Sequence, residues 1–158
     1  MTFNFKNQYK AVKMGAFGKS TQVDVTANQI SETLYSLDNA QANTGISASL
    51  SAGSIVLANK DYIGFFRPTV GSDDRFEMSV KINGSTLSTQ AISFKEFSAG
   101  QVSLNYKTRR QPLMFFYSAS EGDVLSVYYQ KSTPSSIATI YSYTLVQGNI
   151  VHLWEIDK

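Results

Sequence analysis

The 158-residue sequence has no cysteine and a single histidine, His152. Without cysteine the chain can form no disulfide and has no thiolate nucleophile, and one histidine is too few for a zinc site. His152 stands between Val151 and Leu153, and this apolar setting favours a structural or interface role over a catalytic one. Neither a Gly-x-Ser-x-Gly nucleophile turn nor a phosphate-binding glycine loop occurs. The sequence therefore predicts a protein that is not an enzyme and takes no cofactor.

Acidic residues do not gather into a site either, because most of them fall in expected turns, where solvated acids are common. Glycoside hydrolysis would need two carboxylates directed into one groove, and the spacing of these acids does not indicate such a pair. Asp73 and Asp74 are adjacent in an expected loop, so calcium binding there stays open, although no full set of oxygen ligands is visible. We predict no metal site and leave the Asp73-Asp74 question to experiment.

Charge is scarce as well, with 16% charged residues and a formal net charge of +2. This charge is too small and too scattered to predict a nucleic-acid partner. Arg109 and Arg110, in a basic loop, are the candidate loop contacts for an anion, although solvated loop charges are commoner. No stretch reaches the roughly 20 apolar residues of a membrane-spanning helix, and the first residues lack the apolar core of a secretory signal. We expect a protein without a membrane span, made in a cytoplasm.

Short segments with alternating apolar and polar residues are abundant. Side chains in a strand point to opposite faces in turn, so this alternation indicates half-buried strands. Roughly ten such segments recur at the 8–12-residue spacing of sandwiches and barrels. The sequence predicts a single all-β domain over residues 1–158, an antiparallel β-sandwich of two packed sheets. Residues 1–19 are either an N-terminal arm or a first strand, and Asn28–Asp38 is the only candidate helix, with strand as the alternative.

Two glycines carry local predictions. Asn83-Gly84 follows an alternating segment at residues 75–82, and a type I′ turn needs positive φ at both central residues, so a tight hairpin is expected there. Gly64 interrupts an aromatic segment at residues 62–67, where it marks a bulge or a close approach of another group.

The stretch from Leu113 to Gln130 is the most informative part of the chain. It predicts two strands joined by a polar turn, and both strands are apolar on both faces, whereas an antiparallel sheet usually keeps one face wet. We therefore expect one face in the core and the other covered by a second copy of the chain; the alternative is a strand pair buried within one domain. The candidate core or interface residues are Leu113, Met114, Phe115, Phe116, Tyr117, Val124, Leu125, Val127, Tyr128, Tyr129 and Trp154.

Two motifs resemble the C1q/tumour-necrosis-factor superfamily of jelly rolls. Phe76-Glu-Met-Ser-Val-Lys-Ile-Asn-Gly84 is similar to its strand that ends in Asn-Gly, and Glu121-Gly-Asp-Val-Leu-Ser-Val127 to its Gly-Asp turn before an apolar strand. The resemblance covers the last half of the chain, and Ser-Ala-Ser-Glu stands before Gly122 where the family favours a leucine. It implies a jelly roll with its last strand near a trimer axis, as residues 150–156 would be.

Jelly rolls of this kind also form capsid, spike and head-fibre proteins of phages and viruses, and this chain resembles them in its Ser, Thr and Asn content and its lack of cysteine. The first hypothesis is therefore a homotrimeric virion or appendage subunit, such as a spike, decoration or vertex protein. Its expected partners are copies of itself, other virion proteins and a host surface glycan, with a location in the virion after synthesis in the host cytoplasm. The second hypothesis is a monomeric carbohydrate-binding module with an aromatic platform.

Overall fold

The computed structural model describes residues 13–21, 23–25, 31–41, 44–67, 70–72, 76–92, 113–131, 138–140 and 149–156. These residues contain no helix and form fourteen strands in three sheets. The strands are β1 (Lys13–Gly18), β2 (Val23–Val25), β3 (Thr33–Leu34), β4 (Asn39–Gln41), β5 (Ala48–Ser51), β6 (Ser54–Leu57), β7 (Asp61–Phe66), β8 (Val70–Ser72), β9 (Phe76–Ile82), β10 (Ser85–Ile92), β11 (Leu113–Ser118), β12 (Val124–Lys131), β13 (Ala138–Ile140) and β14 (Asn149–Ile156).

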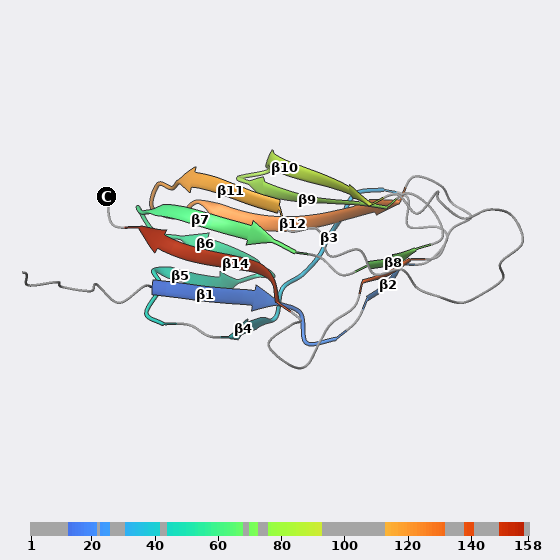
Figure 1. Ribbon diagram of the computed structural model, residues 1–158, viewed down its shortest axis with the longest axis horizontal. Coiled ribbons are helices and arrows are strands. Elements are labelled where there is room, and N and C mark those ends of the chain that lie inside the picture. The colour runs from blue at the N-terminus through green and yellow to red at the C-terminus, as the bar shows by residue number, and fades with distance from the viewer. Residues whose placement is uncertain are drawn as a thin grey trace, which may run out of the picture.

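Two larger sheets lie face to face as the layers of a sandwich (Figure 1). Sheet A has the strand order β11-β7-β14-β1-β4. Sheet C has the order β10-β9-β12-β6-β5, and β3 pairs with β12 outside this path. All of these pairings are antiparallel. The predicted all-β sandwich of jelly-roll type is confirmed.

The core lies between the two sheets and consists of alternate residues from their strands. Sheet A contributes Phe17, Tyr62, Phe66, Val151 and Leu153, each no more than 1% exposed. Sheet C contributes a larger aliphatic set: Ile55, Leu57, Met78, Val80, Leu125 and Val127. Because only every second residue faces inward, the residues between them form the two outer faces of the sandwich.

A small third sheet, β2-β13-β8, lies at one end of the sandwich (Figure 1, right). It joins three segments that are distant in the sequence, and Val25 on β2 is fully buried. Asp73, Asp74, Arg109 and Arg110 lie outside the described residues, so the predictions for them stay predictions.

The two strands predicted within residues 113–130 are present as β11 and β12, but the expectation that they pair with each other as a hairpin is wrong. β11 pairs with β7 in sheet A, whereas β12 pairs with β9 and β6 in sheet C, so the turn at 119–123 connects opposite layers. Both strands are apolar on both faces, and the sequence shows no preference for either partner. The residue pattern alone therefore does not distinguish a tight hairpin from a turn that connects the two layers.

The candidate helix at Asn28–Asp38 is also absent over its described part, 31–38. This segment is extended: β3 pairs with β12 in sheet C, and β4 pairs with β1 in sheet A, so the chain crosses between the layers. Tyr35 donates its backbone N–H to the Val127 carbonyl at 2.7 Å, and Leu37 to that of Gly53 at 2.9 Å. Tyr35 and Leu37 are buried while Ser36 and Asp38 are exposed, so burial alternates with the period of two of a strand. The spacing of Leu34 and Leu37, which fits a helix, did not indicate this alternation.

The glycine predictions have clear outcomes. Asn83 and Gly84 have φ values of 50° and 80° and join β9 to β10, which confirms the predicted hairpin. At Gly64 an added Cβ would overlap the ring of Phe115, so of the two alternatives the close approach is the one present. Lys13–Gly18, within the expected arm or first strand, forms β1 between β14 and β4 in sheet A.

Candidate functional site: the outer face of sheet A

Sheet A carries apolar side chains on the face directed away from the core. Residues directly opposite each other in antiparallel strands point to the same side of a sheet. One row across β11, β7, β14 and β1 therefore contains Phe116, Ile63, Trp154 and Met14. The next row contains Met114, Phe65, His152 and Ala16. These eight residues are called the outer face of sheet A below.

The apolar side chains of this face are most exposed on β11, an edge strand of sheet A. Met114 is 67% exposed and Phe116 is 60% exposed, while Phe115 between them is 8% exposed and faces the core. Toward the middle of the sheet, the rings of Phe65 and Trp154 meet edge to face with centroids 5.1 Å apart. His152 stacks on Trp154 with centroids 6.2 Å apart. The face therefore carries aromatic and aliphatic side chains on four strands, although Ala16 on β1 is only 3% exposed.

The outer face of sheet C differs sharply in composition. Its central rows pair Ser126 with Lys81, Tyr128 with Ser79 and Gln130 with Glu77. Lys81 Nζ lies 2.6 Å from a carboxylate oxygen of Glu32 and 4.9 Å from the centroid of the Tyr128 ring. Such a surface is well suited to water, whereas the outer face of sheet A is not.

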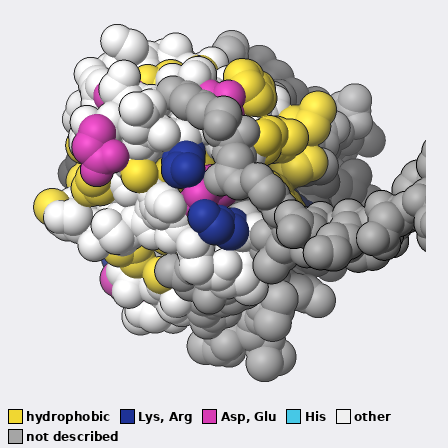
Figure 2. Space-filling model, turned by 90° about the vertical axis from the view of Figure 1, so that its left-hand side faces the viewer, with side chains coloured by type: hydrophobic (Ala, Val, Ile, Leu, Met, Phe, Trp, Pro, Cys, Tyr) yellow, Lys and Arg dark blue, Asp and Glu magenta, His cyan; other side chains and the backbone are white. Residues whose placement is uncertain are grey.

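Figure 2 views the end of the sandwich opposite β2, β8 and β13. Hydrophobic side chains gather at the upper right of this view, on the side of the molecule that sheet A forms, while the middle of the view holds mainly polar and charged groups. This group is the largest of the hydrophobic groups in the view, since smaller ones lie at the left and lower edges, and it agrees with the exposure of Met114 and Phe116.

β11 is held in position by contacts on its core side and at its C-terminal end. Phe115 covers Gly64, and Tyr117 donates its hydroxyl to Asp123 at 2.8 Å. This hydrogen bond to a carboxylate, together with partial burial, raises the pKa of Tyr117. Asp123 also accepts the amide Nδ2 of Asn83 at 2.8 Å, so the β11–β12 turn is tied to the β9–β10 turn. Met114 and Phe116 are thus displayed by a well-anchored strand.

Glu155 anchors the end of β14 from the core side. Its carboxylate accepts the backbone N–H of Ser47 at 2.6 Å and pairs with Lys13 Nζ at 3.0 Å. Burial by itself would raise the pKa of Glu155, but the Ser47 N–H and the Lys13 ammonium outweigh that effect and lower it. Tyr62 donates its hydroxyl to the Ser47 carbonyl at 2.7 Å, which ties β7 to the same loop. Glu155 is thereby a structural anion rather than a reactive one.

The sequence-predicted candidates divide between three environments. Phe115, Leu125, Val127 and Tyr129 are buried in the core, and half-buried Tyr117 packs against it. Met114, Phe116 and Trp154 lie on the outer face of sheet A, and Val124 and Tyr128 are half-buried on sheet C. Leu113 begins β11.

Sequence reasoning did not place Met14, Ile63 and Phe65 among the surface candidates, whereas His152 was expected to have a structural or interface role. A signal was present for two of them, because residues 62–67 are apolar on both faces in the same way as residues 113–117. No comparable pattern distinguishes Met14 from an ordinary half-buried strand residue.

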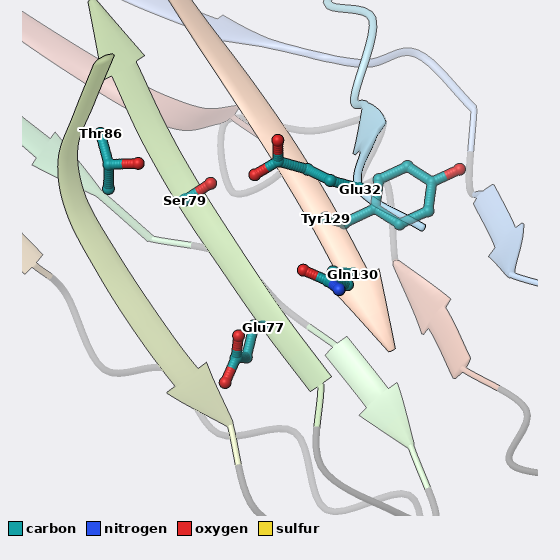
Figure 3. Close-up of a pocket in the computed structure, with 6 residues that line it drawn as sticks. All are labelled: Glu32, Glu77, Ser79, Thr86, Tyr129 and Gln130. Carbon is teal, nitrogen blue, oxygen red and sulfur yellow. The ribbon is translucent and has the colours of Figure 1, made fainter. Parts of the chain in front are cut away.

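A small polar cleft lies on the opposite side of the molecule, on sheet C (Figure 3). β9 supplies Glu77 and Ser79, β10 supplies Thr86 and β12 supplies Tyr129 and Gln130, with Glu32 at the rim. Its volume is about 60 Å³. A water molecule occupies about 30 Å³ in the liquid, and ligand pockets are usually about 300 Å³ or larger. The cleft has room for water but not for a sugar ring.

The part of the chain that the structure describes contains no group of three or more His, Asp or Glu side chains arranged to hold a metal ion. The same residues include no helix that is long and apolar enough to cross a membrane.

Comparison with known proteins identifies the fold. No family model matches the sequence, and no curated protein matches it. Among solved structures, the chain is similar to one described as Eiger TNF from S. frugiperda, with a TM-score of 0.58 and 13% identity. The match covers 94% of this chain and 95% of that chain. At this identity the likeness shows the tumour-necrosis-factor type of jelly roll and nothing more specific.

Proposed function

We propose that this protein is a non-enzymatic subunit of a homotrimer, in which copies meet through the outer face of sheet A. The observation that carries the proposal is the contrast between the two outer faces. Sheet A presents Met114, Phe116, Phe65 and Trp154, whereas the central rows of sheet C hold lysine, glutamate, glutamine, two largely buried serines and a single aromatic ring. Soluble monomers seldom expose large contiguous apolar patches, and subunit interfaces are enriched in aromatic residues and methionine.

The occupant proposed is a second copy of the chain because the apolar rows extend over four strands and include no acid or lysine. Charged residues are depleted at the centre of interfaces because removing them from water is costly. The acid on this side of sheet A, Asp61, lies in the adjoining row, at the edge of the face. The trimeric number is supported by the sequence resemblance, which implies a last strand near a trimer axis. In this chain the last strand is β14, in the middle of sheet A, and it carries Trp154.

Solution mass tests the proposal directly. Light scattering on the wild type should give three times the 17.5 kDa chain mass. Phe116→Ala should shift the population toward smaller, folded species, because the variant loses a ring from the proposed interface, and hot-spot aromatic residues contribute about 2 kcal/mol or more to association.

The matched control is Tyr128→Ala, which removes an aromatic ring from the outer face of sheet C instead. It should leave the mass unchanged. A wild type that is monomeric at every concentration would contradict the assembly proposal and favour the monomeric carbohydrate-binding module, whose stacking platform would then be Trp154 and Phe65. If the wild type is a trimer that is disrupted by Tyr128→Ala but not by Phe116→Ala, the interface lies on sheet C instead.

The narrower proposal, a virion spike, decoration or vertex protein, is supported by the low charge, the Ser, Thr and Asn content and the sequence resemblance. The partners proposed with it are other virion proteins and a host surface glycan. Mass spectrometry of purified particles that carry this gene tests the location: the chain should be present in a fixed ratio to the major capsid protein. Its consistent absence from such particles would remove the virion role and leave the trimer proposal standing.

A further inference from the structure

Asn83-Gly84 is the only Asn-Gly pair in the chain, and both of its residues are exposed. Asparagine before glycine is the pair most prone to spontaneous deamidation, because glycine has no side chain to shield its backbone nitrogen. An added Cβ at Gly84 would meet nothing within 4 Å, so the site is open to solvent. By sequence and exposure alone, Asn83 should be a labile residue.

The side chain of Asn83 is nevertheless held at both ends. Its Nδ2 donates to Asp123 Oδ1 at 2.8 Å, and its Oδ1 accepts the backbone N–H of Val124 at 2.9 Å. The Asn83 backbone N–H also donates to the Val124 carbonyl at 2.9 Å. Asp123 is itself fixed, because its other oxygen accepts the Tyr117 hydroxyl at 2.8 Å and the Ser120 N–H at 2.9 Å. These contacts are called the Asn83–Asp123 clamp below.

We propose that Asn83 is a deamidation site held in check by the Asn83–Asp123 clamp, and that its conversion to aspartate or isoaspartate prevents the clamp from reforming. The reaction requires the Asn83 carboxamide to leave both of its partners and turn its Cγ toward the Gly84 nitrogen. Each hydrogen bond to the carboxamide therefore stabilises the unreactive arrangement. The proposal is independent of subunit assembly.

The chemistry needs only water. The Gly84 nitrogen, after losing its proton to hydroxide, attacks Cγ of Asn83 and closes a five-membered succinimide. The Cγ–Nδ2 bond breaks, and Nδ2 leaves as ammonia after taking up a proton. Water then opens the ring at one of its two carbonyls, which gives aspartate or the β-linked isoaspartate. No oxidation or reduction takes place.

Either product is incompatible with the clamp. Aspartate replaces the Nδ2 donor with a carboxylate oxygen directed at the carboxylate of Asp123, so a hydrogen bond becomes a like-charge contact. Isoaspartate adds a carbon to the backbone of a two-residue turn, whose geometry sets the register of β9 and β10. In both cases the β9–β10 turn separates from the β11–β12 turn.

The first experiment measures the rate of conversion at Asn83 by peptide mass mapping after incubation of the folded protein at mildly alkaline pH. Asp123→Ala should accelerate it roughly tenfold, the factor that corresponds to one charge-assisted hydrogen bond. Tyr117→Phe is the matched control in the same turn, because it removes a contact of Asp123 and leaves both hydrogen bonds to Asn83 in place. It should change the rate little.

Glu155→Gln provides the control for lost stability, since Glu155 bonds Ser47 and Lys13, which lie outside the clamp. If Glu155→Gln accelerates conversion as much as Asp123→Ala, or if Asp123→Ala converts at the wild-type rate, the clamp is not the protecting element and the proposal is overturned.

The second experiment uses Asn83→Asp, the product made directly. It should unfold at a lower temperature than the wild type at neutral pH, and the difference should narrow in acid, where one of the two carboxylates becomes protonated. An Asn83→Asp variant with the wild-type midpoint at neutral pH would show that the product is tolerated, and this half of the proposal would fail.

Discussion

The ring of Phe115 on β11 covers the backbone of Gly64 on β7, its direct partner in the register of sheet A. Three atoms of that ring are the nearest neighbours of any Cβ placed on Gly64. Aromatic rings are known to cover cross-strand glycines in sheets and so restore the apolar contact that glycine lacks. This pair fixes the edge strand that displays Met114 and Phe116.

Gly64→Ala should destabilise the fold by about 1–3 kcal/mol, because the added methyl group overlaps the Phe115 ring and forces it or the backbone to move. Thermal or urea unfolding measures the effect. The double variant with Phe115→Ala should lose less than the sum of the two single losses, since the overlap disappears with the ring. Additive losses would show that the contact does not govern this position.

Phe115→Ala and Phe116→Ala should act on different properties although the residues are adjacent. Phe115 is 8% exposed and belongs to the core, so its truncation should cost about 3–5 kcal/mol of unfolding free energy. Phe116 is 60% exposed, so its truncation should leave unfolding at low protein concentration within about 0.5 kcal/mol of wild type. Chemical denaturation and light scattering on the same samples separate the two effects; equal loss of stability in both variants contradicts the assignment of faces.

Glu155 should make the fold sensitive to acid. Its pKa is lowered in the folded state, so the unfolded chain binds the proton more tightly, and protonation favours unfolding. The stabilisation is complete above the ordinary glutamate pKa of about 4.5 and is lost as the pH falls through the lower folded-state value. Glu155→Gln should therefore be less stable than wild type at neutral pH, and the two midpoints should converge in acid. If the unfolding midpoints of the wild type and Glu155→Gln differ by the same amount at every pH, Glu155 does not make this contribution.

The hydroxyls of Ser54 and Ser126 form a buried hydrogen bond of 2.8 Å between β6 and β12. Either single alanine substitution leaves the other hydroxyl buried without this partner, which should cost about 1–3 kcal/mol. Replacing both should be close to neutral, because no unsatisfied group from this pair then remains. A double variant as unstable as the sum of the singles would mean that packing, rather than the hydrogen bond, decides the outcome.

The sequence by itself determined the class of fold and several of its local features. The alternation of residues 75–82 and the Asn83-Gly84 pair predicted β9, the type I′ turn and the return strand, because side-chain period and turn chemistry are local properties. The last strand that the resemblance placed at residues 150–156 is present as β14. The doubly apolar character of residues 113–117 also indicated that Phe115 and Phe116 would have different surroundings.

Strand partners and the contents of each face were decided only by the tertiary structure. β11 and β12 are joined by a short turn but lie in different sheets, since the partner of a strand depends on segments remote in sequence. For the same reason residues 31–38 are extended rather than helical: their backbone hydrogen bonds go to β12, to Gly53 and to Gly18. The outer face of sheet A exists because four distant strands align their apolar residues in two rows, and no local pattern encodes that alignment.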